Sequence, residues 1–183
     1  MAKKGRKRYA LLLTVLILAG LAGAFTLVYP YKYIGLAREL SAKYGLEPDL
    51  VCAVIHTESR FRSEIVSPKD ARGLMQLTEG TAAWGAEEIG LEGYSFDNVT
   101  EPRINIELGC WYLDVLLKQF GEEDTALAAY NAGSGNVEGW LNDSSISADG
   151  VNLNRIPFGE TRRYVERVRS ARRIYNILLR IGK

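Results

Sequence analysis

The chain has 183 residues, of which 47% are hydrophobic and 25% are charged, and its net charge at pH 7 is +1. This composition excludes a disordered chain, because there is enough apolar surface to build a core. Five of the basic residues lie before residue 9, and without them the net charge falls from +1 to −4. A mildly acidic remainder argues against binding to nucleic acid through phosphate neutralisation, so we expect no nucleic-acid partner.

The first predicted element is an apolar segment near the N-terminus. Residues 9–28 contain no charge over 20 positions, which is about the length of a helix that crosses a bilayer. A cationic cluster precedes it: Lys3, Lys4, Arg6, Lys7 and Arg8. The positive-inside rule then predicts a cytoplasmic segment at 1–8, one transmembrane anchor at 9–29, and an extracytoplasmic domain at 30–183 on the outer side of the cell membrane.

A cleaved signal peptide is the alternative interpretation of this segment. The small residues Ala22, Gly23 and Ala24 resemble a cleavage site. The apolar run continues past them to Val28, which favours the uncleaved anchor. Both interpretations place the domain outside the cytoplasm.

Beyond residue 30 the apolar spacing is helical almost throughout, so a mainly α domain is expected. The expected helices span about 33–44, 48–59, 78–85, 102–120, 123–132 and 160–181, and the one that Pro102 opens is expected to be the longest. No segment alternates apolar and polar residues as a strand would. Residues 60–72 and 142–158 are expected to be irregular, and the second stretch is long and polar enough to be functional or mobile.

The last predicted helix is strongly basic. It contains two acidic residues, Glu160 and Glu166. Its basic residues are more numerous, namely Arg162, Arg163, Arg167, Arg169, Arg172, Arg173, Arg180 and Lys183. We interpret them as a solvated helix face, and a patch for an anionic polymer or lipid surface is the alternative.

Two cysteines, Cys52 and Cys110, lie inside apolar helical patterns. We expect two buried thiols, and a single disulfide is the alternative if the domain lies outside the cytoplasm. Their spacing matches no metal motif, and we expect neither a metal nor a cofactor.

Glu58 is the candidate catalytic residue that the helical pattern singles out. It lies on one helix face with Val51, Val54 and Ile55, so its carboxyl is expected to be partly desolvated. Desolvation raises a carboxyl pKa, as a general acid working near neutral pH requires. A glutamate at a frayed helix end that points into water is the alternative. His56 lies on another face, and we interpret it as structural.

Sequence motifs then carry a family resemblance. Residues 53–78 read AVIHTESRFRSEIVSPKDARGLMQLT, with a Glu-Ser pair, a Ser-Pro turn and a Gly-Leu-Met-Gln segment. Ala-Tyr-Asn-Ala-Gly follows at Ala129 to Gly133, and Glu-Thr-Arg-x-Tyr-Val at Glu160 to Val165. In this order, over about residues 33–181, they resemble lytic transglycosylases of the soluble-lytic-transglycosylase type, which implies a lysozyme-like SLT domain. One departure is Asp70, where many members have glycine.

The resemblance implies a role for individual residues. Glu58 would be the catalytic acid and base. A substrate-binding set would surround it, namely Ser59, Ser67, Met75, Gln76, Tyr130, Asn131, Glu160 and Tyr164. Ser59 would help to position Glu58, Gln76 would contact a substrate amide, and Tyr130 would place its hydroxyl near Glu58.

The resemblance also implies a reaction on peptidoglycan. A lytic transglycosylase cleaves the β-1,4 bond between MurNAc and GlcNAc and leaves a 1,6-anhydro-MurNAc end. One carboxylate suffices, because the substrate's own hydroxyl is the nucleophile. A lysozyme-like hydrolase, which would normally use two carboxylates, and a non-catalytic wall-binding domain are the alternatives.

The three tryptophans have less specific expectations. We expect Trp84 and Trp111 to be core residues. Trp140 borders the polar stretch 142–158, and it either belongs to the core or stacks on a sugar ring.

We predict that the N-terminal segment stays attached to the mature chain, because its apolar run extends beyond the small residues at 22–24. N-terminal sequencing of protein extracted from membranes tests this, and the expected first residue lies before residue 22. A mature chain that begins directly after Ala24 would show that the segment is a cleaved signal peptide.

Overall fold

The computed structural model describes residues 13–20, 23–24, 26–30 and 32–181. Tyr33–Lys183 forms a compact unit separate from residues 1–32. Before that unit, residues 13–20, 23–24 and 26–28 are helical. No helix within the described ranges has the length and apolar character needed to cross a membrane. The cytoplasmic segment predicted at 1–8, and positions 9–12, 21–22 and 25 of the predicted anchor, lie outside the described residues.

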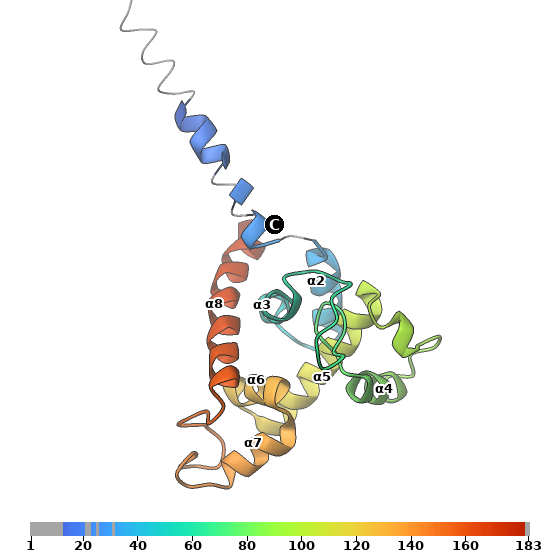
Figure 1. Cartoon of the computed structure of the whole chain (residues 1–183), viewed down its shortest axis with the longest axis vertical. Coiled ribbons are helices and arrows are strands. Elements are labelled where there is room, and N and C mark those ends of the chain that lie inside the picture. Colours follow the sequence, from blue (N-terminus) through green and yellow to red (C-terminus); the bar gives the residue numbers. More distant parts are fainter. Residues whose placement is uncertain (1–12, 21–22, 25, 31, 182–183) are drawn as a thin grey trace, which may run out of the picture. The chain divides into compact units, whose positions relative to one another are not determined.

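The larger unit is mainly helical, as predicted (Figure 1). Its elements in chain order are α2 (Ile34–Lys43), α3 (Pro48–Ser59), α4 (Glu79–Glu88), the 3₁₀ helix η1 (Phe96–Asn98), α5 (Pro102–Phe120), α6 (Glu123–Ala132), α7 (Ser134–Leu141) and α8 (Gly159–Ile181). Extended pairing within the described residues is limited to two isolated bridges, Val66 to Arg72 and Arg72 to Leu77.

Local sequence sets the ends of the two helices that support the site. Pro48 and Pro102 occupy the first turns of α3 and α5, where the missing N–H costs nothing. Gly121 ends α5 in the left-handed region with a φ of 70°, and its N–H donates to the carbonyl of Leu117. These signals explain why the predicted and observed bounds agree closely.

One helical expectation was wrong, and one helix was not predicted. The longest helix is α8, with 23 residues, and not α5, which has 19. The sequence analysis also missed α7, because Gly135 and Gly139 weaken its helical pattern. Burial of Val137 and Trp140 stabilises this short helix through tertiary contacts.

Helix α3 is the centre of the core. It lies between α2 and α8 in Figure 1, and its contacts with α8 are the most extensive in the domain. Val51, Val54 and Ile55 have no exposed surface, so the helix is buried along most of its length. From α8, Tyr164 and Tyr175 are almost fully buried. Among the described residues, the buried hydrophobic side chains all come from Ala37 onward. Tyr33–Lys183 therefore has its own core, as an independently folding unit requires.

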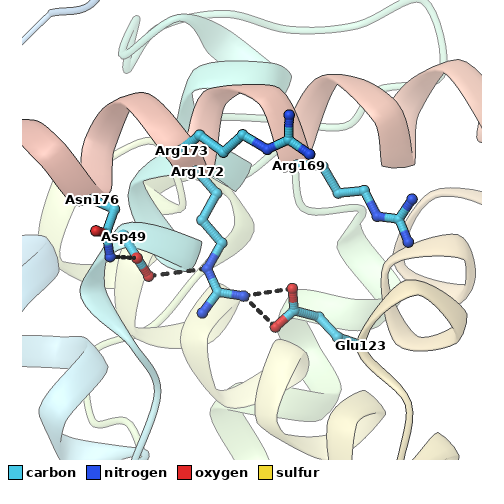
Figure 2. A pocket seen from close by; sticks show the side chains of 6 residues that line it. All are labelled: Asp49, Glu123, Arg169, Arg172, Arg173 and Asn176. Carbon is cyan, nitrogen blue, oxygen red and sulfur yellow. Dashed lines mark hydrogen bonds and ion pairs between the residues drawn. The ribbon is translucent and has the colours of Figure 1, made fainter.

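Arg172 links three helices through ion pairs. Figure 2 shows it reaching from α8 between Asp49 of α3 and Glu123 of α6. Its Nε lies 3.1 Å from the Asp49 carboxylate, and its Nη1 lies 2.5 Å from Glu123. Asn176 donates a further hydrogen bond of 2.6 Å to Asp49. Both carboxylates lie in first helical turns, where negative charge is favourable.

The tryptophans divide differently from the expectation. Trp111 is buried as predicted, but the prediction for Trp84 was wrong, because 46% of that residue is exposed. Trp84 covers Trp111 from outside, with ring centroids 4.8 Å apart and nearly perpendicular planes. Trp140 is buried and packs edge-on against Phe158 at 4.9 Å.

Both cysteines are free and buried, which confirms the expectation of two buried thiols. Burial raises the pKa of Cys52 to about 12. Burial also raises the pKa of Cys110, and the neighbouring Cys52 adds to that effect. The two thiols therefore remain protonated at neutral pH.

The stretch from 142 to 158 is irregular, as expected, and it makes hydrogen bonds within itself and to α6. Asp149 accepts hydrogen bonds from the backbone of Val151 and Asn152. Ile146 is buried, and Thr125 of α6 donates to the carbonyl of Val151 at 2.9 Å. These contacts connect the loop to itself and to α6.

We predict that Gly109→Ala destabilises the domain and that Gly139→Ala does not. An added Cβ at Gly109 would lie 2.9 Å from the Cβ of the fully buried Met75, so overpacking should cost about 1–3 kcal/mol. At Gly139, exposed on α7, nothing lies within 4 Å, and alanine should add about 0.5–1 kcal/mol by helix propensity. Urea unfolding measures both, and equal effects would contradict the packing argument.

Candidate active site

A cavity of about 630 Å³ opens where four segments of the chain meet. Glu58 contributes from the end of α3, and Tyr130 and Asn131 contribute from the end of α6. The turn-rich stretch 67–78 forms a further wall, and the start of α8 closes the cavity. Residues widely separated in sequence therefore converge on one carboxyl group.

Burial tunes the Glu58 carboxyl toward proton donation. Desolvation raises its pKa from 4.5 to about 7, while Tyr164 and the charge of Arg167 act in the opposite direction. The apolar turns of α3 that precede Glu58 supply this environment. Near neutral pH the group therefore populates both its acid and its base form, as proton transfer in both directions requires.

Two tyrosines flank this carboxyl. The Tyr130 hydroxyl donates to the carbonyl of Met75 at 2.8 Å. The Tyr164 hydroxyl is buried, contacts Glu58 electrostatically, and has no hydrogen bond of ordinary geometry within the described residues. Burial raises both tyrosine pKa values, and the charge of Glu58 raises them further. Both hydroxyls therefore stay protonated beside the acid.

Ser67 organises the turn opposite Glu58. Its Oγ accepts hydrogen bonds from the backbone N–H groups of Lys69 at 3.2 Å and Ala71 at 3.0 Å. These bonds use the acceptor lone pairs of the hydroxyl and leave its O–H as a donor. Asp70 adopts a φ of 58°, a left-handed conformation that aspartate tolerates, so the turn forms without glycine at this position.

Gln76 lines the cavity with its amide in a defined orientation. Its Nε2 donates to the carbonyls of Ile65 at 3.1 Å and Gly73 at 2.9 Å. Since both partners are acceptors, the amide nitrogen must face them. The Oε1 atom is left as an acceptor for an N–H group, which is the complement of a substrate amide.

Asn105 holds this turn in place, and the sequence analysis missed it. Its side chain donates to the carbonyls of Arg72 at 3.0 Å and Val99 at 2.8 Å, and it accepts from the N–H of Met75 at 2.7 Å. The residue is completely buried. The sequence did contain a signal for this role, since Asn105 is a polar residue within the apolar run of α5. A buried amide needs hydrogen-bond partners, so a structural role could have been predicted for it.

Six predicted site residues line the cavity: Glu58, Ser67, Gln76, Tyr130, Asn131 and Glu160. Tyr164 lies behind Glu58 rather than in the lining. Lining residues that the prediction omitted are Pro68, Lys69, Ala71, Thr78, Ala132, Asn136, Phe158 and Thr161. Among these residues, Thr161 connects α8 to α6, because its hydroxyl donates a hydrogen bond to the Asn131 Oδ1 at 2.8 Å.

Besides Tyr164, two further predicted residues, Met75 and Ser59, lie outside the cavity lining. The Met75 side chain is fully buried against Gly109, so only its backbone reaches the site through Tyr130. Ser59 is 1% exposed, and its Oγ donates to the Ile55 carbonyl one turn earlier in α3. A helix turns about 100° per residue, so the neighbour of Glu58 points elsewhere. Neither side chain lines the cavity in this structure, and their substrate-binding roles stay predictions.

The described residues contain no group of three or more His, Cys, Asp or Glu side chains arranged to hold a metal ion. His56 is half-buried against Tyr175, with its Nδ1 3.3 Å from the tyrosine hydroxyl. Desolvation lowers the pKa of His56. This contact agrees with the structural role expected for the histidine.

Comparison with known proteins assigns the chain to a family. The family model described as Transglycosylase SLT domain matches residues 35–151. The chain therefore belongs to the SLT transglycosylase domain family, and its fold is the mainly helical, lysozyme-like fold of that family.

Individual relatives agree with this assignment. The soluble lytic murein transglycosylase of Escherichia coli is 35% identical over 143 residues, covering 76% of this chain and 22% of the relative. Membrane-bound lytic murein transglycosylase C of Salmonella arizonae is 34% identical over 171 residues, covering 79% of this chain and 46% of the relative. The chain thus spans less than half the length of these relatives.

Solved structures give the same fold. An inactive mutant of lytic transglycosylase Slt from Pseudomonas aeruginosa superimposes with a TM-score of 0.74 at 34% identity, over 83% of this chain and 25% of that one. The 70 kDa soluble lytic transglycosylase of Escherichia coli gives a TM-score of 0.73 at 30% identity, over 82% and 25%.

We predict that Glu58→Gln stabilises the domain in a pH-dependent way. A raised carboxyl pKa means that the folded state holds the proton more tightly, so the wild type loses stability as pH rises from 4.5 to about 7. The variant has no such group and should be more stable by on the order of 3 kcal/mol near pH 8, with little difference near pH 4.

Denaturant unfolding at several pH values measures this difference. Glu92→Gln makes the same chemical change at an exposed side chain and serves as the control. A stability gap for Glu58→Gln that stays constant across the pH range would contradict a desolvated carboxyl.

Proposed function

We propose that this chain is a peptidoglycan lytic transglycosylase that cleaves the MurNAc–GlcNAc β-1,4 bond and forms a 1,6-anhydro-MurNAc end. The supporting observation is a single carboxyl, Glu58, whose pKa is raised to about 7 and which lines a cavity built from the family motifs. The relatives named lytic murein transglycosylases support the same activity.

Glu58 serves as acid and then as base in this proposal. Its protonated carboxyl donates to the bridging oxygen, and the bond between that oxygen and the MurNAc C1 breaks. The N-acetyl group of the same sugar steadies the cationic carbon. The Glu58 carboxylate then takes the proton from the C6 hydroxyl, and the C6 oxygen bonds to C1. The proton that Glu58 gave up leaves on the GlcNAc hydroxyl, the proton from the C6 hydroxyl replaces it on Glu58, and no water is consumed.

The cavity residues supply orientation for these steps. The Oε1 of Gln76 is free to accept from a sugar amide, and the Ser67 O–H is free to donate. The Tyr164 hydroxyl, buried beside Glu58, can donate to the carboxylate that forms after the first proton transfer. Because the attacking hydroxyl belongs to the substrate, its tethering replaces a second catalytic carboxylate.

A lysozyme-like hydrolase is the second candidate, because Glu160 lines the same cavity. Hydrolysis would use it to activate water or to attack the sugar. Glu160 is exposed, however, and Asp70 is held by Arg72 at 2.9 Å outside the lining. These placements favour a reaction that uses the Glu58 carboxyl without a second carboxylate.

The proposal includes a location at the cell envelope. The uncharged segment 9–28 with its preceding cations would anchor the chain in the cell membrane, with the catalytic domain outside the cytoplasm and its glycan substrate within reach. A membrane-bound lytic murein transglycosylase among the relatives supports an envelope location.

We expect Glu58→Gln to reduce peptidoglycan digestion by at least about 10²- to 10⁴-fold, because it removes the transferable proton while keeping the side-chain shape. Glu92→Gln, at an exposed loop position, should digest at the wild-type rate. Release of soluble muropeptides measures the rates, and circular dichroism verifies folding.

Mass spectrometry of the wild-type digest separates the two enzymatic candidates. An anhydro end is lighter than a hydrolysed end by one water, and the proposal requires anhydro-muropeptides as the main product. Hydrolysed ends alone would identify a hydrolase. Unchanged digestion by Glu58→Gln would overturn the role of Glu58 whichever product appears.

A further inference from the structure

The last two turns of α8 carry an exposed face of mixed character. Arg173 and Arg180 are exposed cations, and Ile177 and Ile181 are 55% and 78% exposed. At about 100° per residue these positions fall within one third of the helix circumference. We call these residues the α8 terminal face. The core side of the same turns is separate, because Tyr175, Leu178 and Leu179 are buried.

The two cations of this face are not used inside the domain. Within the described part of the chain, neither Arg173 nor Arg180 has an ion-pair partner. Figure 2 shows Arg173 pointing away from Asp49 and Glu123, while Arg172 occupies both of these carboxylates. Both nearby carboxylates are therefore already engaged by Arg172, and the Arg173 and Arg180 side chains, which are exposed, remain available to an external anion.

The fold places this face beside the start of the domain. Arg38, in the second turn of α2, donates from Nη2 to the carbonyl of Leu179 at 2.7 Å. The end of α8 therefore lies next to the helix through which the chain enters the domain. Only residues 29–33 separate that helix from the end of the apolar segment, and so short a link reaches at most about 20 Å.

From these observations we propose that the α8 terminal face binds the surface of a membrane that contains anionic lipids. The inference rests on the membrane anchoring put forward under Proposed function, which brings the start of α2 to the bilayer. Arginines at such a surface bind lipid phosphates, and the isoleucines between them enter the headgroup region. The contact would fix the orientation of the catalytic cavity relative to the membrane.

A lipid surface fits this face better than a soluble anionic polymer does. Phosphate groups of a polymer would bind the arginines but would gain nothing from Ile177 and Ile181. Exposed isoleucines are costly in water, and burial of each stabilises a complex with an apolar phase. The combination of cations and large apolar side chains on one helix face is typical of interfacial helices.

Co-sedimentation with vesicles of phosphatidylglycerol and phosphatidylcholine tests the proposal on the folded part, residues 33–183, which lacks the anchor and needs no glycan. The wild type should bind these vesicles and not pure phosphatidylcholine. Arg173→Gln with Arg180→Gln should lower the partition coefficient about 30-fold, because each cation near such a surface contributes about fivefold.

A matched control removes two charges elsewhere on the same helix. The control variant is Arg162→Gln with Arg163→Gln. These two residues lie about 25 Å along α8 from Arg180, a distance greater than the screening length at physiological salt. This double variant should bind vesicles as the wild type does. An equal loss for both double variants would overturn the proposal, because it would indicate a general charge effect.

Ile177→Ser with Ile181→Ser distinguishes lipid from polymer. The double variant should lose vesicle binding while its binding to soluble polyphosphate stays at the wild-type level. Wild-type protein that binds polyphosphate but not anionic vesicles would assign the face to an anionic polymer and overturn the proposal. Cleavage after Ala24 would contradict the proposed membrane anchor but not lipid binding by the α8 terminal face, since the vesicle measurement uses a protein without residues 1–32.

Discussion

The burial of one carboxyl group at the end of α3 is the constraint on which the site depends. Glu58 follows a helix whose other turns are almost entirely enclosed, and Tyr164 of α8 closes the space behind it. Desolvation of this kind costs stability, so the packing of α8 along α3 must offset it. Arg172 contributes to that packing, because it ties α8 to both Asp49 and Glu123.

Side-chain hydrogen bonds to the backbone hold the turn at 65–77, which contributes Ser67 and Gln76 to the cavity. Asn105, Ser67 and the Gln76 amide all spend hydrogen bonds on main-chain atoms between residues 65 and 77. Gly73 and Gln76 both adopt positive φ values, of 82° and 49°. Such a turn has little regular secondary structure, so side-chain hydrogen bonds replace the strand ladder that would otherwise define it.

Apolar spacing and helix-end signals were sufficient to predict most of the fold. Pro48, Pro102 and Gly121 gave correct limits, whereas α7 escaped because tertiary burial outweighs the low helix propensity of its glycines. For the site, motifs predicted which residues meet at the cavity but not which way each side chain points. Ser59 and Met75 belong to the motifs yet point into the protein, a distinction that depends on packing against α3 and Gly109.

The two cysteines have a consequence for how the domain reaches its native state. Their thiols are shielded and protonated once packing is complete, so oxidants outside the cytoplasm cannot readily attack them. Before packing, no such shield exists, and Cys52 and Cys110 could be joined or capped. In an exported chain, formation of the core would therefore compete with oxidation of the two thiols. Completion of the packing around α3 and α5, the helices that carry these thiols, would then decide whether both cysteines stay reduced.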